Sequence, residues 1–268
     1  MRLDDSQLER YRHDGYLVFP ELLSPDEVAV LNADVPTLQS DRRGHAGANV
    51  HTSAGGLRSS YSPRLDSPAF DALVRIDRVL GPVRQLLGGE VYLYQSRLNA
   101  KPRGDQGAAW QWHQDFPSWY HDGLPAPHLM TALIFVSDVV EDNAPMSIIP
   151  GGHRRQEDYF YETEQTGYAL HSLTPDALDR LTAEHAPVQL TGAAGTVVFF
   201  HCLLPHCSGA SRTDAPRNLM FQVYNRDDNR PVGDQWRRPH RSPWLLEHDT
   251  SVLAPVSDQA LTALASAA

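Results

Sequence analysis

The sequence predicts an α+β fold in which helices in the first third of the chain support a β-sandwich or jelly roll. Two observations carry this prediction. Up to residue 89, apolar side chains recur at the spacing of a helix face, whereas beyond it they alternate or form short runs, as in strands. Turns that contain Gly, Pro or Asn separate these runs. Helices followed by several short strands indicate an α+β chain.

The helices are predicted in three segments of the first 89 residues. Residues 6–13 form a short helix that stops at Gly15. The second helix follows Ser24, which acts as N-cap, with a proline at the first helical position and Glu27 closing a capping box. The third covers residues 67–87, where apolar residues keep helical spacing until two glycines end it. We expect these helices to brace the β part of the chain.

The segment from Ser40 to Asp66 is expected to be a long surface loop. It is rich in Gly, Ser and Arg and shows little periodicity. A loop of this length inside a compact domain is more often a lid or a mobile segment than a structural necessity. We therefore predict that it folds over the site described below, where its arginines would contact a carboxylate of the substrate.

The strands are predicted in the middle of the chain. Five segments have the pattern of strands and their turns: residues 91–101, 129–139, 147–153, 195–209 and 217–225. A polar insertion is expected at 154–187. The whole chain is predicted to be a single domain, residues 1–268, with a helical part at about 1–89, a β core at about 90–225 and an irregular C-terminal tail.

The composition argues against several classes of partner. With a formal net charge of −10, the chain is not expected to bind nucleic acid or an anionic membrane surface. No apolar run approaches the roughly 20 residues that cross a bilayer, and the polar start does not resemble a secretory signal. Cys202 and Cys207 are expected to be free thiols. These features predict a cytoplasmic protein, monomer or homodimer, whose partner is a small molecule.

One stretch, "AWQWHQDFPSWY", places a histidine and an aspartate two residues apart. Alternate residues of a strand face the same side, so His113 and Asp115 are able to bind one metal ion. A third ligand has to come from elsewhere in the chain. The candidates C-terminal to the pair include His201, at the end of a predicted strand, and His206, just after a turn.

The residues that follow His206 make it the better candidate. Ser208 follows it by two positions and Arg217 by eleven, so one hairpin would place all three along one side of a pocket. Two imidazoles and one carboxylate bind Fe(II) on one face and leave the opposite positions open for a bidentate organic acid and O2. An arginine fork takes the far carboxylate of that acid. The pattern predicts a 2-oxoglutarate-dependent oxygenase.

Four stretches, "YLYQSRLNAK", "WQWHQDFPSWYHDGLP", "IIPGGH" and "HCSGASRTDAPRNLMFQVYN", resemble the phytanoyl-CoA dioxygenase superfamily, in its branch of ectoine hydroxylases and free amino acid hydroxylases. The resemblance runs from about Gly15 to Asn225. It implies a double-stranded β-helix, a cupin-like jelly roll, with Fe(II) held by His113, Asp115 and His206 and with 2-oxoglutarate and O2 as cosubstrates. It also implies the residues that bind 2-oxoglutarate, namely Arg217 and Ser208 at the C5 carboxylate and Gln95 and Asn99 near the C1 end.

The resemblance further implies a substrate pocket with one cation, two hydroxyls and an aromatic wall, which suits a small zwitterion or amide. The corresponding residues are Arg97, Ser118, Trp119, Thr131, Phe200 and Phe221. The chain departs from the family's His-Ser-Asp-Phe-Glu-Thr-Trp, because it carries His-Gln-Asp-Phe-Pro-Ser-Trp at 113–119. Ectoine itself is therefore not the expected substrate.

The predicted function is hydroxylation of a small amino acid or amino-acid-derived metabolite in specialised metabolism. The alternative is the same chemistry, as hydroxylation, desaturation or ring closure, on a larger natural-product intermediate such as a cyclic dipeptide. A halogenase would need a small residue in place of Asp115, which stands against it. A catalytically inactive, metabolite-binding jelly roll is opposed by the complete set of predicted ligands together with Arg217.

Overall fold

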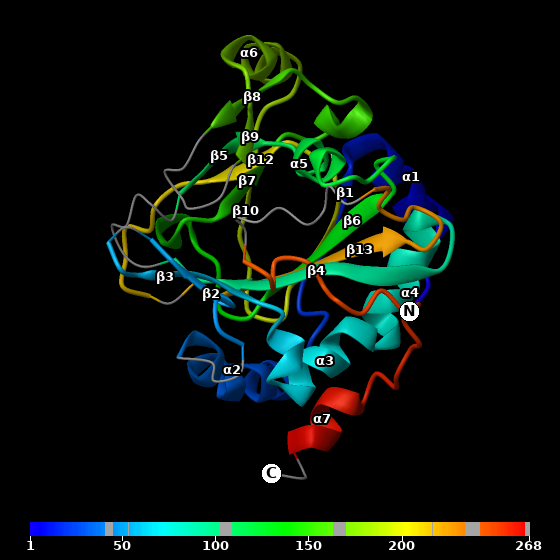
Figure 1. Cartoon of the computed structure of the whole chain (residues 1–268), viewed down its shortest axis with the longest axis vertical. Coiled ribbons are helices and arrows are strands. Elements are labelled where there is room, and N and C mark those ends of the chain that lie inside the picture. The colour runs from blue at the N-terminus through cyan, green and yellow to red at the C-terminus, as the bar shows by residue number, and fades with distance from the viewer. Residues whose placement is uncertain are drawn as a thin grey trace.

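Two antiparallel sheets form the β part of the protein (Figure 1). The structure is a computed structural model, and it describes residues 1–40, 45–52, 54–101, 109–162, 170–215, 217–233 and 242–265. The larger sheet has seven strands in the order β1 (Tyr16–Phe19), β11 (Val197–His201), β6 (Leu129–Phe135), β13 (Leu219–Arg226), β4 (Val91–Asn99), β3 (Leu57–Tyr61) and β2 (Asn49–His51). The smaller has six: β10 (Val188–Leu190), β7 (Met146–Ile148), β12 (His206–Ser208), β5 (Trp110–His113), β9 (Leu170–Leu173) and β8 (Tyr159–Glu162).

The larger sheet is buried on both faces, because alternate side chains of its central strands enter two different cores. From β6, Leu133 and Phe135 pack with Met146 and Ile148 of β7, between the two sheets. On the opposite face, Ile134 and its alternate neighbours pack against the helices. Burial on both sides explains why these strands are continuously apolar in sequence. The predicted jelly-roll architecture with supporting helices is confirmed.

Seven helices are present among the described residues. Five of them contribute to the helical layer: α1 (Asp5–Asp14), α2 (Pro25–Gln39), α3 (Pro68–Arg75), α4 (Asp77–Leu87) and α7 (Ala260–Ala265). Figure 1 shows α2, α3 and α7 on one side of the larger sheet. The other two follow strands of the smaller sheet: α5 (Phe116–His121) and α6 (Pro175–Glu184). Short 3₁₀ turns occur at η1 (Pro63–Leu65), η3 (Glu141–Asn143) and η4 (Gly152–Arg154). None of the described helices has the length and hydropathy needed to span a bilayer.

The predicted start of α2 is confirmed in its atomic detail. The backbone N–H of Glu27 donates to Ser24 Oγ (3.3 Å), and the N–H of Ser24 donates to Glu27 Oε2 (2.8 Å). The capping box therefore satisfies two donors that a helix end otherwise leaves without partners. The first helix ends as predicted at Gly15, whose φ of 82° is one that glycine adopts without strain.

Ser24→Ala should lower the free energy of unfolding by about 1 kcal/mol, because the alanine leaves a helical N–H without its acceptor. Urea unfolding followed by circular dichroism measures this change. Ser6→Ala is the control, since Ser6 is exposed inside α1. That variant should not lose stability. Equal free energies of unfolding for Ser24→Ala and the wild type would mean that the box contributes nothing.

The helix predicted over residues 67–87 is in fact two helices. They are separated at Ile76, which is extended (φ −59°, ψ 136°) and forms an isolated bridge with Val256. Apolar spacing did not reveal the break, because α3 and α4 bury their apolar faces in the same core cluster on either side of Ile76. Periodicity reports which face is buried and is insensitive to a one-residue interruption.

The prediction of a long surface loop from Ser40 to Asp66 is wrong, because this segment contains β2, β3 and η1. Within it, β2 and β3 form a hairpin, and β3 pairs with the edge of β4. The sequence of β3, "LRSSY", has no apolar alternation because its buried positions are polar: Ser60 Oγ, for example, donates to Leu38 O at 2.9 Å. β3 is a fixed part of the sheet rather than a lid. Arg42 and Arg43 of this segment lie outside the described residues.

Three further expectations need correction. The first 89 residues are not only helical, since β1 pairs with β11 at the other edge of the larger sheet. The polar insertion at 154–187 contains β8, β9 and α6, whose strands extend the smaller sheet. The tail beyond Asn225 contains α7, whose Leu261 is fully buried against the helical layer. In each case only a few apolar residues per element contact the core, too few for a period to be visible.

Candidate active site

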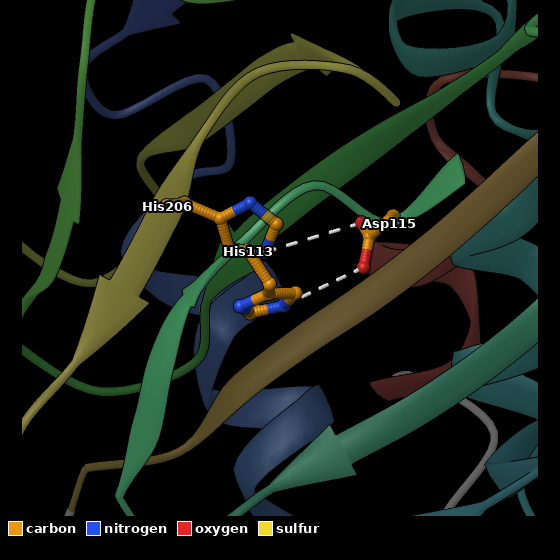
Figure 2. Close-up of side chains that lie close together, drawn as sticks. All are labelled: His113, Asp115 and His206. Atoms are coloured by element: carbon orange, nitrogen blue, oxygen red, sulfur yellow. Dashed lines mark ion pairs between the residues drawn. The ribbon is translucent and has the colours of Figure 1, made fainter. Parts of the chain in front are cut away.

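Three predicted metal ligands, His113, Asp115 and His206, lie close together (Figure 2). The two histidines belong to the smaller sheet, whereas Asp115 lies beyond the end of β5, at the N-cap of α5, and not in the strand that was predicted to carry it. Their ligand atoms all lie within 4.8 Å of one another. Strand pairing explains the meeting: His113 ends β5, His206 begins β12, and the two are direct partners in the antiparallel register. The Asp115 carboxylate faces both rings, with Oδ1 3.7 Å from Nε2 of His113 and Oδ2 4.0 Å from Nε2 of His206.

Hydrogen bonds to backbone carbonyls orient both imidazoles. Nδ1 of His113 lies 2.7 Å from Gln111 O, and Nδ1 of His206 lies 2.9 Å from Leu204 O. Because a carbonyl only accepts, each Nδ1 carries the proton and each Nε2 keeps its lone pair for a metal. Burial, followed by the proximity of His206, holds the pKa of His113 well below its usual value, so this ring is neutral. Two neutral nitrogens and one carboxylate are a donor set that fits Fe(II).

The other candidate for the third ligand, His201, lies outside this group. It ends β11 in the larger sheet, and its Nδ1 accepts the backbone N–H of Leu203 at 3.1 Å. Its ring neighbours are His153 and Tyr11. Burial lowers the pKa of His201 to about 4. Cys207 is not part of the group of converging ligand atoms, and burial raises the pKa of its thiol to about 11.

A small pocket opens beside the two histidines. Its wall joins residues of both sheets, so it lies where the jelly roll opens. It contains five of the predicted cosubstrate and substrate residues together with the two imidazoles. The lining residues are Arg97, Asn99, Trp110, His113, Met146, His206, Cys207, Ser208, Arg217 and Phe221.

Arg217 is a buried cation in this pocket. Its side chain is 3% exposed, and Nε and Nη2 donate to Ala144 O at 3.2 and 3.0 Å. No carboxylate among the described residues pairs with it. Burial lowers the pKa of Arg217 to about 9, which still leaves the guanidinium charged at neutral pH. A buried charge without a counterion is costly, so the arrangement fits an anionic ligand such as 2-oxoglutarate.

The second guanidinium of the pocket belongs to Arg97 on β4. Its Nη1 donates to Gln95 Oε1 (3.3 Å), and its Cζ lies 4.9 Å from the ring centre of Phe221 and 5.2 Å from that of Trp110. Arg58 stacks on the same indole at 3.9 Å. Aromatic faces thus hold Arg97 in place. Trp110 was not predicted, and only its location three residues before His113 pointed to it. Arg58 was included only among the arginines of Ser40 to Asp66 that were expected at the site.

Gln95, predicted to contact the cosubstrate, is absent from the pocket wall. Its amide Nε2 donates to Leu245 O in the C-terminal segment at 2.9 Å, and its Oε1 accepts from Arg97. Gln95 therefore connects Arg97 to the tail. Asn99, four residues further along β4, does line the pocket.

Four predicted substrate residues are buried near the pocket but do not line it. Ser118 Oγ lies 2.9 Å from His171 Nδ1, and the ring of Trp119 packs edge-on against Tyr94. The ring of Phe200 lies 5.2 Å from that of His206. Thr131 is fully buried in β6, and its hydroxyl has no partner among the described residues. These four share burial away from the pocket wall, and among them Phe200 packs against a predicted ligand.

Comparisons with known proteins agree with this geometry. The family described as phytanoyl-CoA dioxygenase matches residues 11–219. Ectoine dioxygenase of Halomonas elongata is 34% identical over 257 residues, 92% of this chain and 77% of that protein. L-proline trans-4-hydroxylase of Streptomyces griseoviridis is 32% identical over 262 residues, 92% of this chain and 94% of that protein.

Solved structures are similar as well. EctD from S. alaskensis, with 2-oxoglutarate and 5-hydroxyectoine, superposes with a TM-score of 0.81 at 29% identity, covering 95% of this chain and 88% of that one. The form with bound Fe gives the same TM-score. The epimerase SnoN from nogalamycin biosynthesis shares the fold, with a TM-score of 0.66 at 21% identity.

Proposed function

Because this chain belongs to the phytanoyl-CoA dioxygenase family, we propose that His113, Asp115 and His206 hold its iron and that its substrate carries a carboxylate. The protein is an Fe(II)- and 2-oxoglutarate-dependent hydroxylase of small amino acid derivatives, like the ectoine and proline hydroxylases that it resembles along most of its length. The observation that supports the assignment best is the convergence of two Nε2 atoms and one carboxylate beside a pocket with an uncompensated arginine.

The chain's own residues have separate tasks in this proposal. With iron and 2-oxoglutarate bound, the centre uses O2 to hydroxylate a C–H bond while 2-oxoglutarate becomes succinate and CO2. Arg217 binds the C5 carboxylate through its planar fork, and Ser208 adds a hydroxyl donor beside it. Asn99 offers its amide to the other end of the cosubstrate.

Arg97 determines the substrate class in this proposal. It is the remaining guanidinium of the pocket wall, and the rings of Trp110 and Phe221 flank it. A planar cation that is held between aromatic faces favours a carboxylate in a fixed orientation. The aromatic walls also exclude water from the carbon that reacts. A free amino acid or a cyclic amino-acid derivative with its carboxylate intact meets these conditions.

Aerobic incubation with Fe(II), 2-oxoglutarate and a panel of compounds tests the proposal. The panel contains free amino acids, ectoine, and cyclic dipeptides, which have no free carboxylate. We expect a gain of one oxygen by mass in a carboxylate-bearing compound, with succinate formed in equal amount. Oxidation of cyclic dipeptides alone would favour the larger-substrate alternative. No conversion of 2-oxoglutarate with any compound would indicate a binding protein instead of an enzyme.

We also propose that the protein works in the cytoplasm, as a monomer or homodimer, without nucleic acid or membrane partners. Two features support this setting. The formal net charge of −10 disfavours polyanions. Cys202 and Cys207 are both free thiols, as expected in a reducing compartment.

A further inference from the structure

We propose that Ser59 is a positioning residue for 2-oxoglutarate, because its hydroxyl holds the side-chain amide of Asn99 in place at the pocket, with the NH₂ group left for the cosubstrate. The inference rests on the role proposed above for Asn99. It adds a residue of β3, a strand that sequence analysis placed in a loop and that contributes no residue to the pocket wall itself.

The contact between the two side chains is short and shielded. Ser59 Oγ donates to Asn99 Oδ1 at 2.7 Å, and the two side chains are only 1% and 4% exposed. The residues are direct partners in the antiparallel pairing of β3 with β4. Two paired strands therefore hold both ends of the hydrogen bond, and the bond does not depend on a loop.

This hydrogen bond tethers the Asn99 amide through its oxygen. A carboxamide has an oxygen that only accepts and a nitrogen that only donates. Because Oδ1 accepts from Ser59, the two N–H donors of Asn99 remain for the pocket that the residue lines. The flipped amide would present its oxygen to an anionic cosubstrate and repel it. Without the hydroxyl, the amide would lose the contact that holds it, and its NH₂ group would no longer be fixed in place for the cosubstrate.

The neighbouring residue provides a matched control. Ser60 is the next residue of β3, is also fully buried, and its hydroxyl donates to Leu38 O at 2.9 Å, toward α2. Ser60→Ala removes a buried hydroxyl from the same strand but from the side away from Asn99. A role of Ser59 in merely fixing β3 to the sheet would make the two serine variants behave alike.

The experiment measures the dissociation constant of 2-oxoglutarate by calorimetry, on Fe(II)-loaded protein without oxygen. Ser59→Ala should weaken binding about 5- to 20-fold with unchanged iron content. Ser60→Ala should bind like the wild type, and Ser59→Thr, which keeps the hydroxyl, should recover most of the affinity. Asn99→Ala should lose at least as much as Ser59→Ala. The double variant should lose no more than Asn99→Ala alone, because Ser59 acts through that amide.

The outcomes separate this inference from the proposed function. Normal affinity in Ser59→Ala together with weak binding in Asn99→Ala would refute the positioning role and leave Asn99 as a cosubstrate residue. Equal losses in the two serine variants would show a structural role only. Normal affinity in Asn99→Ala would overturn the assignment of Asn99 and this inference with it, while the iron site and Arg217 would be unaffected. The double-variant cycle decides the matter even if Ser59→Thr does not fold.

Discussion

His206→Ala should lose bound iron and all turnover of 2-oxoglutarate. The imidazole is one of only three protein donors in the group, and its Nε2 is aligned by the Nδ1 contact with Leu204 O. Removing a ligand leaves two donors and an open side, which should lower iron affinity by more than about a hundredfold. Metal analysis after dialysis measures the iron, and succinate formation measures turnover.

His201→Ala is the matched control for this loss. It removes the other candidate histidine, whose ring lies among His153 and Tyr11 instead of beside Asp115. That variant should keep its iron and its turnover once it is shown to be folded. If His201→Ala lost its iron while His206→Ala kept it, the proposed distal ligand would be wrong.

Arg217→Lys should weaken 2-oxoglutarate binding by about 30- to 1,000-fold, equivalent to about 2 to 4 kcal/mol. Lysine keeps a positive charge but has no planar fork, and a buried ammonium cannot reproduce two parallel N–H bonds to a carboxylate. The iron ligands are untouched, so iron content should stay at the wild-type level. Calorimetric titration of the Fe(II)-loaded protein with 2-oxoglutarate, in the absence of oxygen, measures the loss.

Arg212→Lys provides the control for the arginine-to-lysine change. Arg212 is exposed, pairs with Asp142 at the surface and precedes Arg217 by only five positions. The Arg212→Lys variant should bind 2-oxoglutarate with the affinity of the wild type. Unchanged cosubstrate affinity in Arg217→Lys, with weaker binding of the hydroxylated compound, would instead assign Arg217 to the substrate.

The two histidine candidates show how far sequence reasoning carried the site. The chemistry of His113 and Asp115 was evident from their types and spacing, although Asp115 begins α5 and does not lie in the predicted strand. Arg217 supported the choice of His206 over His201. What places His206 beside His113 is the register between β12 and β5, which joins segments far apart in the chain. A shift of one residue would turn the imidazole to the other face of the sheet.

Apolar periodicity and capping residues predicted some helices and strands and missed others. They located α1, α2 and the central strands β4, β6, β11 and β13, because those elements bury apolar faces or carry local end signals. They failed at β3, where three of the four buried side chains are polar or charged, namely Arg58, Ser59 and Ser60. Buried polar residues have no hydrophobic period, and only their partners make their burial favourable.

By itself, the sequence determined that helices precede the central strands, and it indicated the proposed iron-binding donor set and the proposed cation for an organic acid, since each depends on residue type and local spacing. The tertiary structure alone decided which neighbours orient these groups. Ser59 reaches Asn99 across a strand pair, Gln95 joins Arg97 to the C-terminal segment, and Arg58 stacks on Trp110. Apart from the bond between Gln95 and Arg97, these contacts join residues that are distant in the chain. Their pairing arises from how the sheets and the tail pack, which no local pattern encodes.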